Sequence, residues 1–67
     1  MSWSGLGRIF AMEGNEYIAK NCYILSYSYS KNKEKAYQYL ANGANETTPL
    51  VRKALLSAYE EISNNGE

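Results

Sequence analysis

Apolar residues recur at helical spacing through the last third of the chain. Seven apolar side chains occupy about half of the circumference of a helical projection after Thr48-Pro49: Leu50, Val51, Ala54, Leu55, Ala58, Tyr59 and Ile62. Thr48 is a favourable N-cap residue, and Pro49 fits the first helical position because the N–H it lacks has no partner there. The pattern therefore predicts a helix near residues 48–64.

A shorter helix is predicted near residues 33–42. Asn32 can cap its start, and three residues that favour burial share one side of it: Ala36, Tyr37 and Leu40. The Asn42-Gly43 pair is a typical helix end, where glycine often adopts the left-handed conformation. We therefore expect Gly43 to have a positive φ and to end this helix.

Two periodicities compete between residues 16 and 30. At helical spacing, one stripe holds Ile18, Cys22, Leu25 and Tyr29. At strand spacing, a different set alternates with Ile24 and three serines: Tyr23, Leu25, Tyr27 and Tyr29. Neither a hairpin turn nor a second strand-like segment follows, so a strand here would lack a partner within the chain. These points favour a helix over 16–30, and a strand over 22–30 that pairs with another chain stays open as the alternative.

The opening segment carries weaker signals. Leu6, Ile9 and Phe10 would share a helical face, although two glycines within the segment disfavour a helix. A short helix over Leu6–Met12 is expected if another element packs on it, and Gly14-Asn15 reads as a break followed by an N-cap. The fold class expected for the single domain 1–67 is all-α, with three helices or, if this segment folds, four.

The residue types exclude several chemistries. The 67 residues include seven glutamates but no histidine and no aspartate, and Cys22 is the single cysteine. The usual side chain for proton transfer near neutral pH is missing, and one cysteine can form neither an internal disulfide nor a cysteine cluster for a metal. Cys22 lies on an apolar stripe, which is typical of a small buried residue. We therefore expect no catalytic residue, no cofactor and no metal, and a protein that is not an enzyme.

No targeting or membrane-spanning segment is evident in the sequence. The N-terminal residues lack the charged start and the unbroken apolar stretch of a signal peptide. No run approaches the roughly 18 apolar residues of a membrane helix. A cytoplasmic location and a reduced thiol are the expectation.

The aromatic residues exceed what a small core can enclose. Seven tyrosines, Trp3 and Phe10 occur in 67 residues, and exposed aromatic side chains are enriched at protein interfaces. The alternative is an ordinary scatter of surface tyrosines. We expect a small inhibitor, adaptor or regulatory subunit that binds a larger protein, or itself as a homo-oligomer. The predicted contact residues are Trp3, Phe10, Tyr23, Tyr27 and Leu56.

The segment 27–39 offers a second function. Residues 17–40 carry four lysines against Glu34, a local charge of +3, although the whole chain has a net charge of zero. Tyrosine rings among lysines are typical of proteins that stack on single-stranded nucleic acid and contact its phosphates. The residues that would serve a nucleic-acid-binding regulator are Lys31, Lys33, Lys35, Tyr37 and Tyr39.

Overall fold

The computed structural model describes residues 2–65, and these residues form four α-helices. The helices are α1 (Trp3–Met12), α2 (Glu16–Ser28), α3 (Lys33–Ala41) and α4 (Pro49–Asn65), with a short 3₁₀ helix η1 (Asn42–Asn45) between α3 and α4. Within the described range there is no strand. The all-α prediction is confirmed in its four-helix form, and α2 rather than a strand occupies the region with two periodicities.

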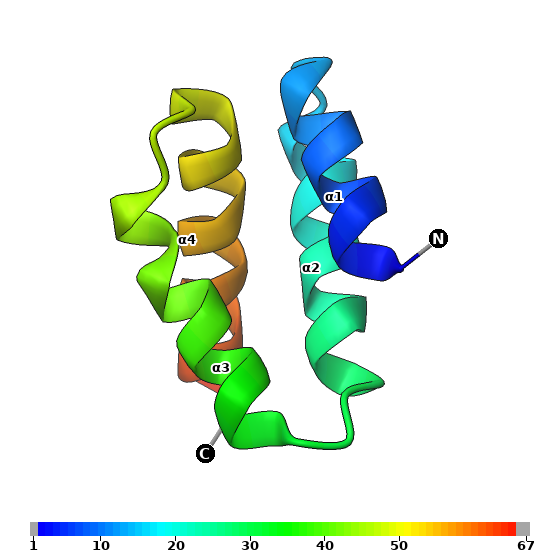
Figure 1. The fold of residues 1–67 in the computed structure, drawn as a ribbon, viewed down its shortest axis with the longest axis vertical. Helices are drawn as coiled ribbons and strands as arrows, with labels where there is room; N and C mark the ends of the chain where they lie inside the picture. The colour runs from blue at the N-terminus through cyan, green and yellow to red at the C-terminus, as the bar shows by residue number, and fades with distance from the viewer. Residues whose placement is uncertain (1, 66–67) are drawn as a thin grey trace.

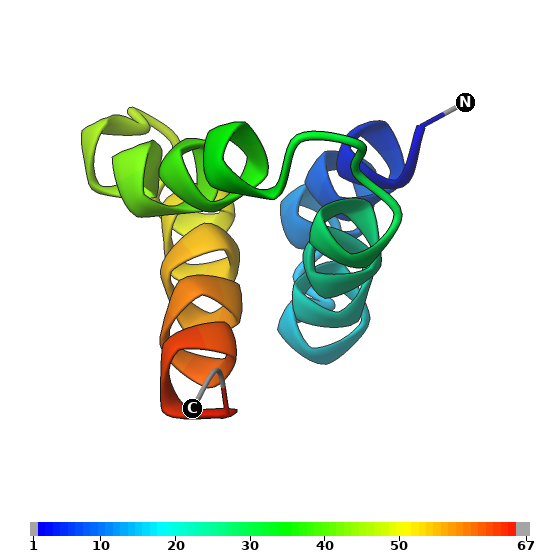
Figure 2. The same ribbon diagram turned by 90° about the horizontal axis from the view of Figure 1, so that it is seen from below.

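The helices pair into two antiparallel hairpins. The first hairpin joins α1 to α2, and the second joins α3 through η1 to α4 (Figure 1). In both ribbon views α1 and α3 lie in one layer, and α2 and α4 lie in the other (Figures 1 and 2). Each half therefore has one helix in each layer, and the core lies where the two halves meet.

The break predicted at Gly14 and the caps predicted at Asn15 and Asn32 are present. Gly14 has a φ of 85°, so it adopts the left-handed conformation directly after α1. The side chain of Asn15 accepts the N–H of Ile18 at 3.3 Å, and that of Asn32 accepts the N–H of Lys35 at 3.1 Å. These bonds satisfy N–H groups that have no partner within the helix, and they set the starts of α2 and α3.

The N-terminal helix begins earlier than predicted. It starts at Trp3 instead of Leu6, and the hydroxyl of Ser2 accepts the N–H of Gly5 at 3.2 Å as its cap. Gly7 and Ala11 form its buried side. The glycine that lowers the helix propensity of this segment therefore also lets α1 lie close to its neighbours.

Tyr23 lies at the centre of the core, with an exposed fraction of 0%. The other buried members of the cluster come from α1, α2, α3 and α4: Ala11, Ala19, Leu40, Val51, Ala54, Leu55 and Ala58. The prediction that Tyr23 contacts a partner is wrong. Its ring is directed inward, where Gly7 leaves room for it, and Ile18 and Tyr29 are exposed instead.

Gly43 also differs from the prediction. Among the described residues only Gly14 has a positive φ, and Gly43 lies buried within η1. A Cβ atom at Gly43 would lie 2.5 Å from the Cβ of Leu55. Glycine is required at this position because η1 approaches α4 closely, and not because the backbone is left-handed.

Candidate functional site

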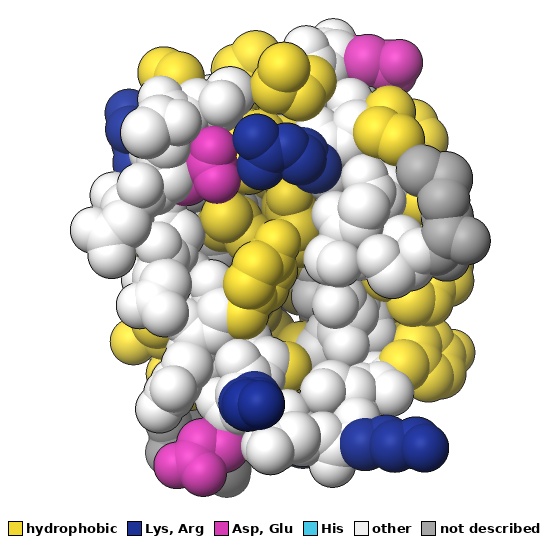
Figure 3. All heavy atoms as spheres, viewed as in Figure 1, with side chains coloured by type: hydrophobic (Ala, Val, Ile, Leu, Met, Phe, Trp, Pro, Cys, Tyr) yellow, Lys and Arg dark blue, Asp and Glu magenta, His cyan; other side chains and the backbone are white. Residues whose placement is uncertain are grey.

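Exposed apolar side chains are concentrated on the α1–α2 hairpin. Eight large apolar residues are exposed within residues 2–65, and six of them belong to this hairpin and its C-cap: Trp3, Ile9, Met12, Tyr17, Ile18 and Tyr29. Met12 is 55% exposed and Tyr29 is 71% exposed. Figure 3 shows hydrophobic side chains gathered along its right-hand edge, over α1 and α2. We call the surface formed by Trp3, Ile9, Met12, Ile18 and Tyr29 the hairpin face.

The hairpin face carries little charge. Residues 1–30 hold four of the 14 charged residues: Arg8, Glu13, Glu16 and Lys20. Three of these four form ion pairs with the second half of the chain: Arg8–Glu46 at 3.4 Å, Lys20–Glu61 at 2.8 Å and Lys53–Glu16 at 3.6 Å. Glu13 is the fourth. The outward surface of the hairpin therefore combines exposed apolar side chains with few charged residues, as at the centre of a protein interface.

The five predicted contact residues do not form one exposed surface. Trp3 is exposed on α1, whereas Phe10 and Tyr27 are partly buried and pack against the core. Leu56 is partly buried on α4, in the other half of the molecule, and Tyr23 lies inside. Of the five, Trp3 contributes most clearly to the hairpin face.

Sequence reasoning missed most of the hairpin face. Ile9 and Met12 are three residues apart and therefore neighbours on α1, and Ile18 and Tyr29 recur on one stripe of α2. The signal that points to them is the scarcity of charged residues before residue 31. A search that weighs missing charges as well as aromatic content would find this surface.

Lys33 and Tyr37, both predicted to contact nucleic acid, are engaged within the chain. The ammonium group of Lys33 donates to the carbonyl oxygens of Ser28 at 2.7 Å and Ser30 at 2.9 Å. The hydroxyl of Tyr37 lies 2.6 Å from that of Ser63, and this hydrogen bond lowers the pKa of Tyr37. Lys33 therefore helps to hold the α2–α3 turn, and Tyr37 helps to hold the end of α4.

Lys35 and Tyr39 lie on a different side of α3. They line a hollow of about 270 Å³ that also includes Ser4 and Ser26. The first of the predicted residues, Lys31, lies exposed in the turn before α3. The structure therefore separates the five residues into groups and does not bring them together in a single groove.

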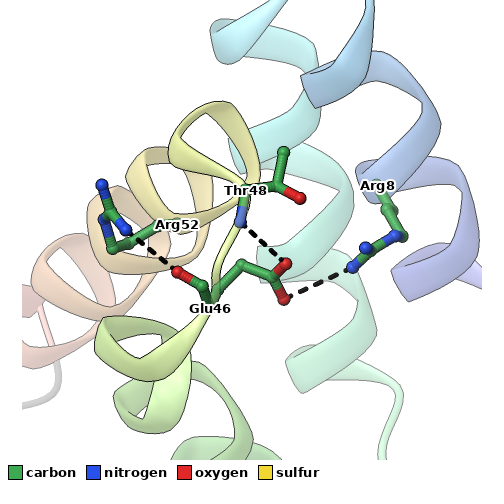
Figure 4. Close-up of polar contacts among 4 residues, drawn as sticks. All are labelled: Arg8, Glu46, Thr48 and Arg52. Atoms are coloured by element: carbon green, nitrogen blue, oxygen red, sulfur yellow. Dashed lines mark hydrogen bonds and ion pairs between the residues drawn. The ribbon is translucent and has the colours of Figure 1, made fainter.

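A polar network joins the two halves at Glu46 (Figure 4). Its carboxylate accepts the N–H of Thr48 at 3.2 Å and a guanidinium N–H of Arg8 at 3.4 Å. Its carbonyl oxygen accepts from Arg52 at 3.0 Å. The Thr48 N–H, followed by Arg8, holds the pKa of Glu46 below its ordinary value. The network positions the loop before α4 against α1.

The hydroxyl of Tyr23 lies within the core. This oxygen is buried and has no hydrogen-bond partner among the described residues. Burial is the main reason why the pKa of Tyr23 is raised to about 12, because the charged form loses its hydration. An unpaired buried hydroxyl destabilises the fold, so the position of Tyr23 is set by the packing of its ring.

Cys22 is buried, as predicted, and burial raises the pKa of its thiol. Nowhere in residues 2–65 do three His, Cys, Asp or Glu side chains come together in a way that could hold a metal ion. Over the same residues, none of the helices combines the length and the apolar character needed to cross a membrane.

Comparison with known proteins identifies no relative of this chain. It matches no family model, no curated protein and no solved structure.

Proposed function

We propose that this chain is a small protein-interaction module that binds its partner through the hairpin face. The observation that carries the proposal is the placement on the hairpin face of five of the eight large apolar side chains that are exposed within residues 2–65. Removing apolar surface from water contributes a favourable free energy of about 25 cal/mol per Å², so exposed apolar side chains favour association. The chain would act as an inhibitor, adaptor or regulatory subunit, by binding and not by catalysis.

The size of the chain suits one committed interface. A standard interface buries about 800 Å² of accessible surface on each partner. This is about a fifth of the 4454 Å² accessible surface of this chain. The occupant is a larger protein or a second copy of the chain, and the buried thiol of Cys22 is compatible with the reducing cytoplasm in which we place it.

Paired variants test the proposal. Ile9→Ser with Met12→Ser removes two exposed apolar side chains from the hairpin face, and Tyr39→Ser with Leu50→Ser removes two from the other half. Each variant is used to capture proteins from lysate of the source cells, and its own association is followed by sedimentation across a concentration series. We expect the first pair to lose a partner or self-association that the wild type and the second pair retain. Equal behaviour of all three chains in both measurements would overturn the proposal.

A further inference from the structure

A groove runs between α2 and α4. Its larger part is a hollow of about 770 Å³ lined by the first turns of α2 and the second half of α4. A smaller hollow of about 240 Å³ continues it along both helices and shares Glu61 and Asn65 with it. Figure 2 shows that neither α1 nor α3 covers this side of α2 and α4. The groove follows α2 from Glu16 to Ser28, about 20 Å at the rise of an α-helix.

The groove has an acidic end. Three carboxylates line the larger hollow, those of Glu16, Glu60 and Glu61. Two ammonium groups face them: Lys20, which also lines the hollow, and Lys53, which pairs with Glu16. Glu61 pairs with Lys20 at 2.8 Å, and Glu16 accepts from Ser57 at 3.0 Å and lies 3.6 Å from Lys53. Glu60 is exposed and forms no ion pair with any other residue in 2–65. The carboxylate of Glu60 is therefore available to a cation from outside.

Glu60 and Glu61 lie at an unfavourable position on α4. The C-terminal end of a helix carries partial negative charge, so Glu60 and Glu61 near the end of α4 oppose the helix dipole. Lys20 offsets this for Glu61, but no described residue does so for Glu60. A cation bound here would interact favourably with Glu60 and with the end of α4 at once.

The rest of the groove is apolar. Tyr17 lies at the acidic end with 69% of its surface exposed. Ile24, Tyr27 and Ile62 line the continuation and are partly buried. A ligand that fits both parts must present an apolar stripe along its length and positive charge at one end.

We infer that the α2–α4 groove binds a basic amphipathic helix of a partner protein, about 13 residues long. Its apolar stripe lies on Tyr17, Tyr27 and Ile62, and a lysine or arginine pairs with Glu60. The groove is about 20 Å long along α2, which sets the length of the bound helix. The carboxylate of Glu60, which has no ion pair within residues 2–65, sets its charge. This surface differs from the hairpin face, so the inference does not depend on the function proposed above.

The test uses a labelled synthetic helical peptide of about 14 residues with leucine at every third or fourth position and lysine elsewhere. A second peptide carries glutamate in place of lysine. Fluorescence anisotropy measures binding to the full chain, and amide chemical shifts locate it. We expect the basic peptide to bind along α2 and α4 and the acidic peptide not to bind.

Variants with matched charge separate the groove from general attraction. Glu60→Lys should weaken binding of the basic peptide by about tenfold or more, whereas Glu13→Lys, which changes the net charge equally, should weaken it by less than about twofold. Tyr17→Ser should weaken binding through loss of apolar contact, and Ile9→Ser with Met12→Ser should leave it unchanged. These residues are exposed, so circular dichroism should show an intact fold for each variant.

Three results would overturn the inference. The first is equal weakening by Glu60→Lys and Glu13→Lys, and the second is binding of both peptides or chemical shifts confined to α1. The third is a dimer of the wild type that Glu60→Lys converts to a monomer without any peptide binding, because the occupant would then be a second copy of the chain.

Discussion

The two halves of the chain differ in how they meet the solvent. Residues 1–30 contain four charged residues, and residues 31–67 contain ten. Among the residues that the structure describes, the exposed large apolar residues have the opposite distribution, with six in residues 2–30 and two in residues 31–65, Tyr39 and Leu50. Both halves nevertheless supply the same core, so the difference lies at the surface alone.

This contrast indicates which surface has a task beyond solubility. A small chain needs charged residues to stay dispersed, and the second half supplies them. In the first half Arg8, Glu16 and Lys20 are paired with the other half, so Glu13 is the only charged residue of this half without an ion pair among the described residues. The contrast is explained if the outward side of the hairpin is covered when the protein acts.

The largest expected loss of stability comes from a substitution at the close contact between η1 and α4 in the second half. In Gly43→Ala the new Cβ would lie 2.5 Å from the Cβ of Leu55, so α4 and η1 must move apart. We expect the free energy of unfolding to fall by about 3 kcal/mol. Gly7→Ala, the equivalent contact of the first half, places a Cβ 3.0 Å from the ring of Tyr23, and a smaller loss of about 1 kcal/mol is expected because the ring can shift. Urea unfolding followed by circular dichroism ranks the two, and the reverse order would contradict the assignment of the tighter contact to Gly43.

Tyr23, where the two halves meet, gives the next largest effect. Tyr23→Phe removes the unpaired buried hydroxyl and keeps the ring, so the free energy of unfolding should rise by about 1 kcal/mol. Tyr39→Phe, which removes the hydroxyl of an exposed tyrosine, is the control and should change little. A loss of stability in Tyr23→Phe would mean that the hydroxyl has a partner.

The same variant has a signature in alkaline solution. The pKa of Tyr23 is raised to about 12 in the folded chain, above the ordinary value near 10, so the folded state holds this proton more tightly. The corresponding contribution to stability is complete below about pH 10 and is lost as the pH rises through about 12. The difference in stability between the wild type and Tyr23→Phe should therefore change over this interval, and a constant difference would argue against the raised pKa.

Substitutions in the network at Glu46 should lower the stability by a smaller amount. Glu46→Ala removes the acceptor for both Thr48 and Arg8, whereas Arg8→Ala removes only the more distant contact. We expect a larger fall in the urea midpoint for Glu46→Ala than for Arg8→Ala. Because the pKa of Glu46 is lowered, its contribution is present above the ordinary carboxyl pKa and is lost as the pH falls through the lowered value. The midpoints of Glu46→Ala and wild type should converge in acid, and a constant gap would count against the ion pair.

The smallest expected change in stability comes from substitutions in the hairpin face. Ile9→Ser with Met12→Ser should alter the free energy of unfolding by less than about 0.5 kcal/mol, since both side chains are exposed. Urea unfolding at a concentration too low for self-association checks this. A larger loss would show that the hairpin face serves the fold of the single chain.

The elements that follow from local rules were predictable from the sequence. The apolar side of α4, the break at Gly14 and the caps at Asn15 and Asn32 depend on residues close together in the chain. They are confirmed, except that Leu50 at the start of α4 is exposed. Such features need no knowledge of what packs where.

The features that depend on packing between distant segments were not predictable. The two apolar stripes of α2 are alike in periodicity, and Tyr23 is buried only because Gly7 of α1 admits its ring. The role of Gly43 depends on Leu55, twelve residues later in the chain. The residues of the hairpin face were missed for the same reason, because the exposed side of a helix is known only once its buried side is known.

The central claim is that the protein binds its partner through the hairpin face, and amide hydrogen exchange of the complex tests it most directly. The partner recovered by capture, or a concentrated sample if the chain binds itself, is compared with the isolated chain. We expect slower exchange in α1 (Trp3–Met12) and α2 (Glu16–Ser28), with little change along α3 (Lys33–Ala41). Protection confined to α3 and α4, with α1 exchanging as in the isolated chain, would contradict it.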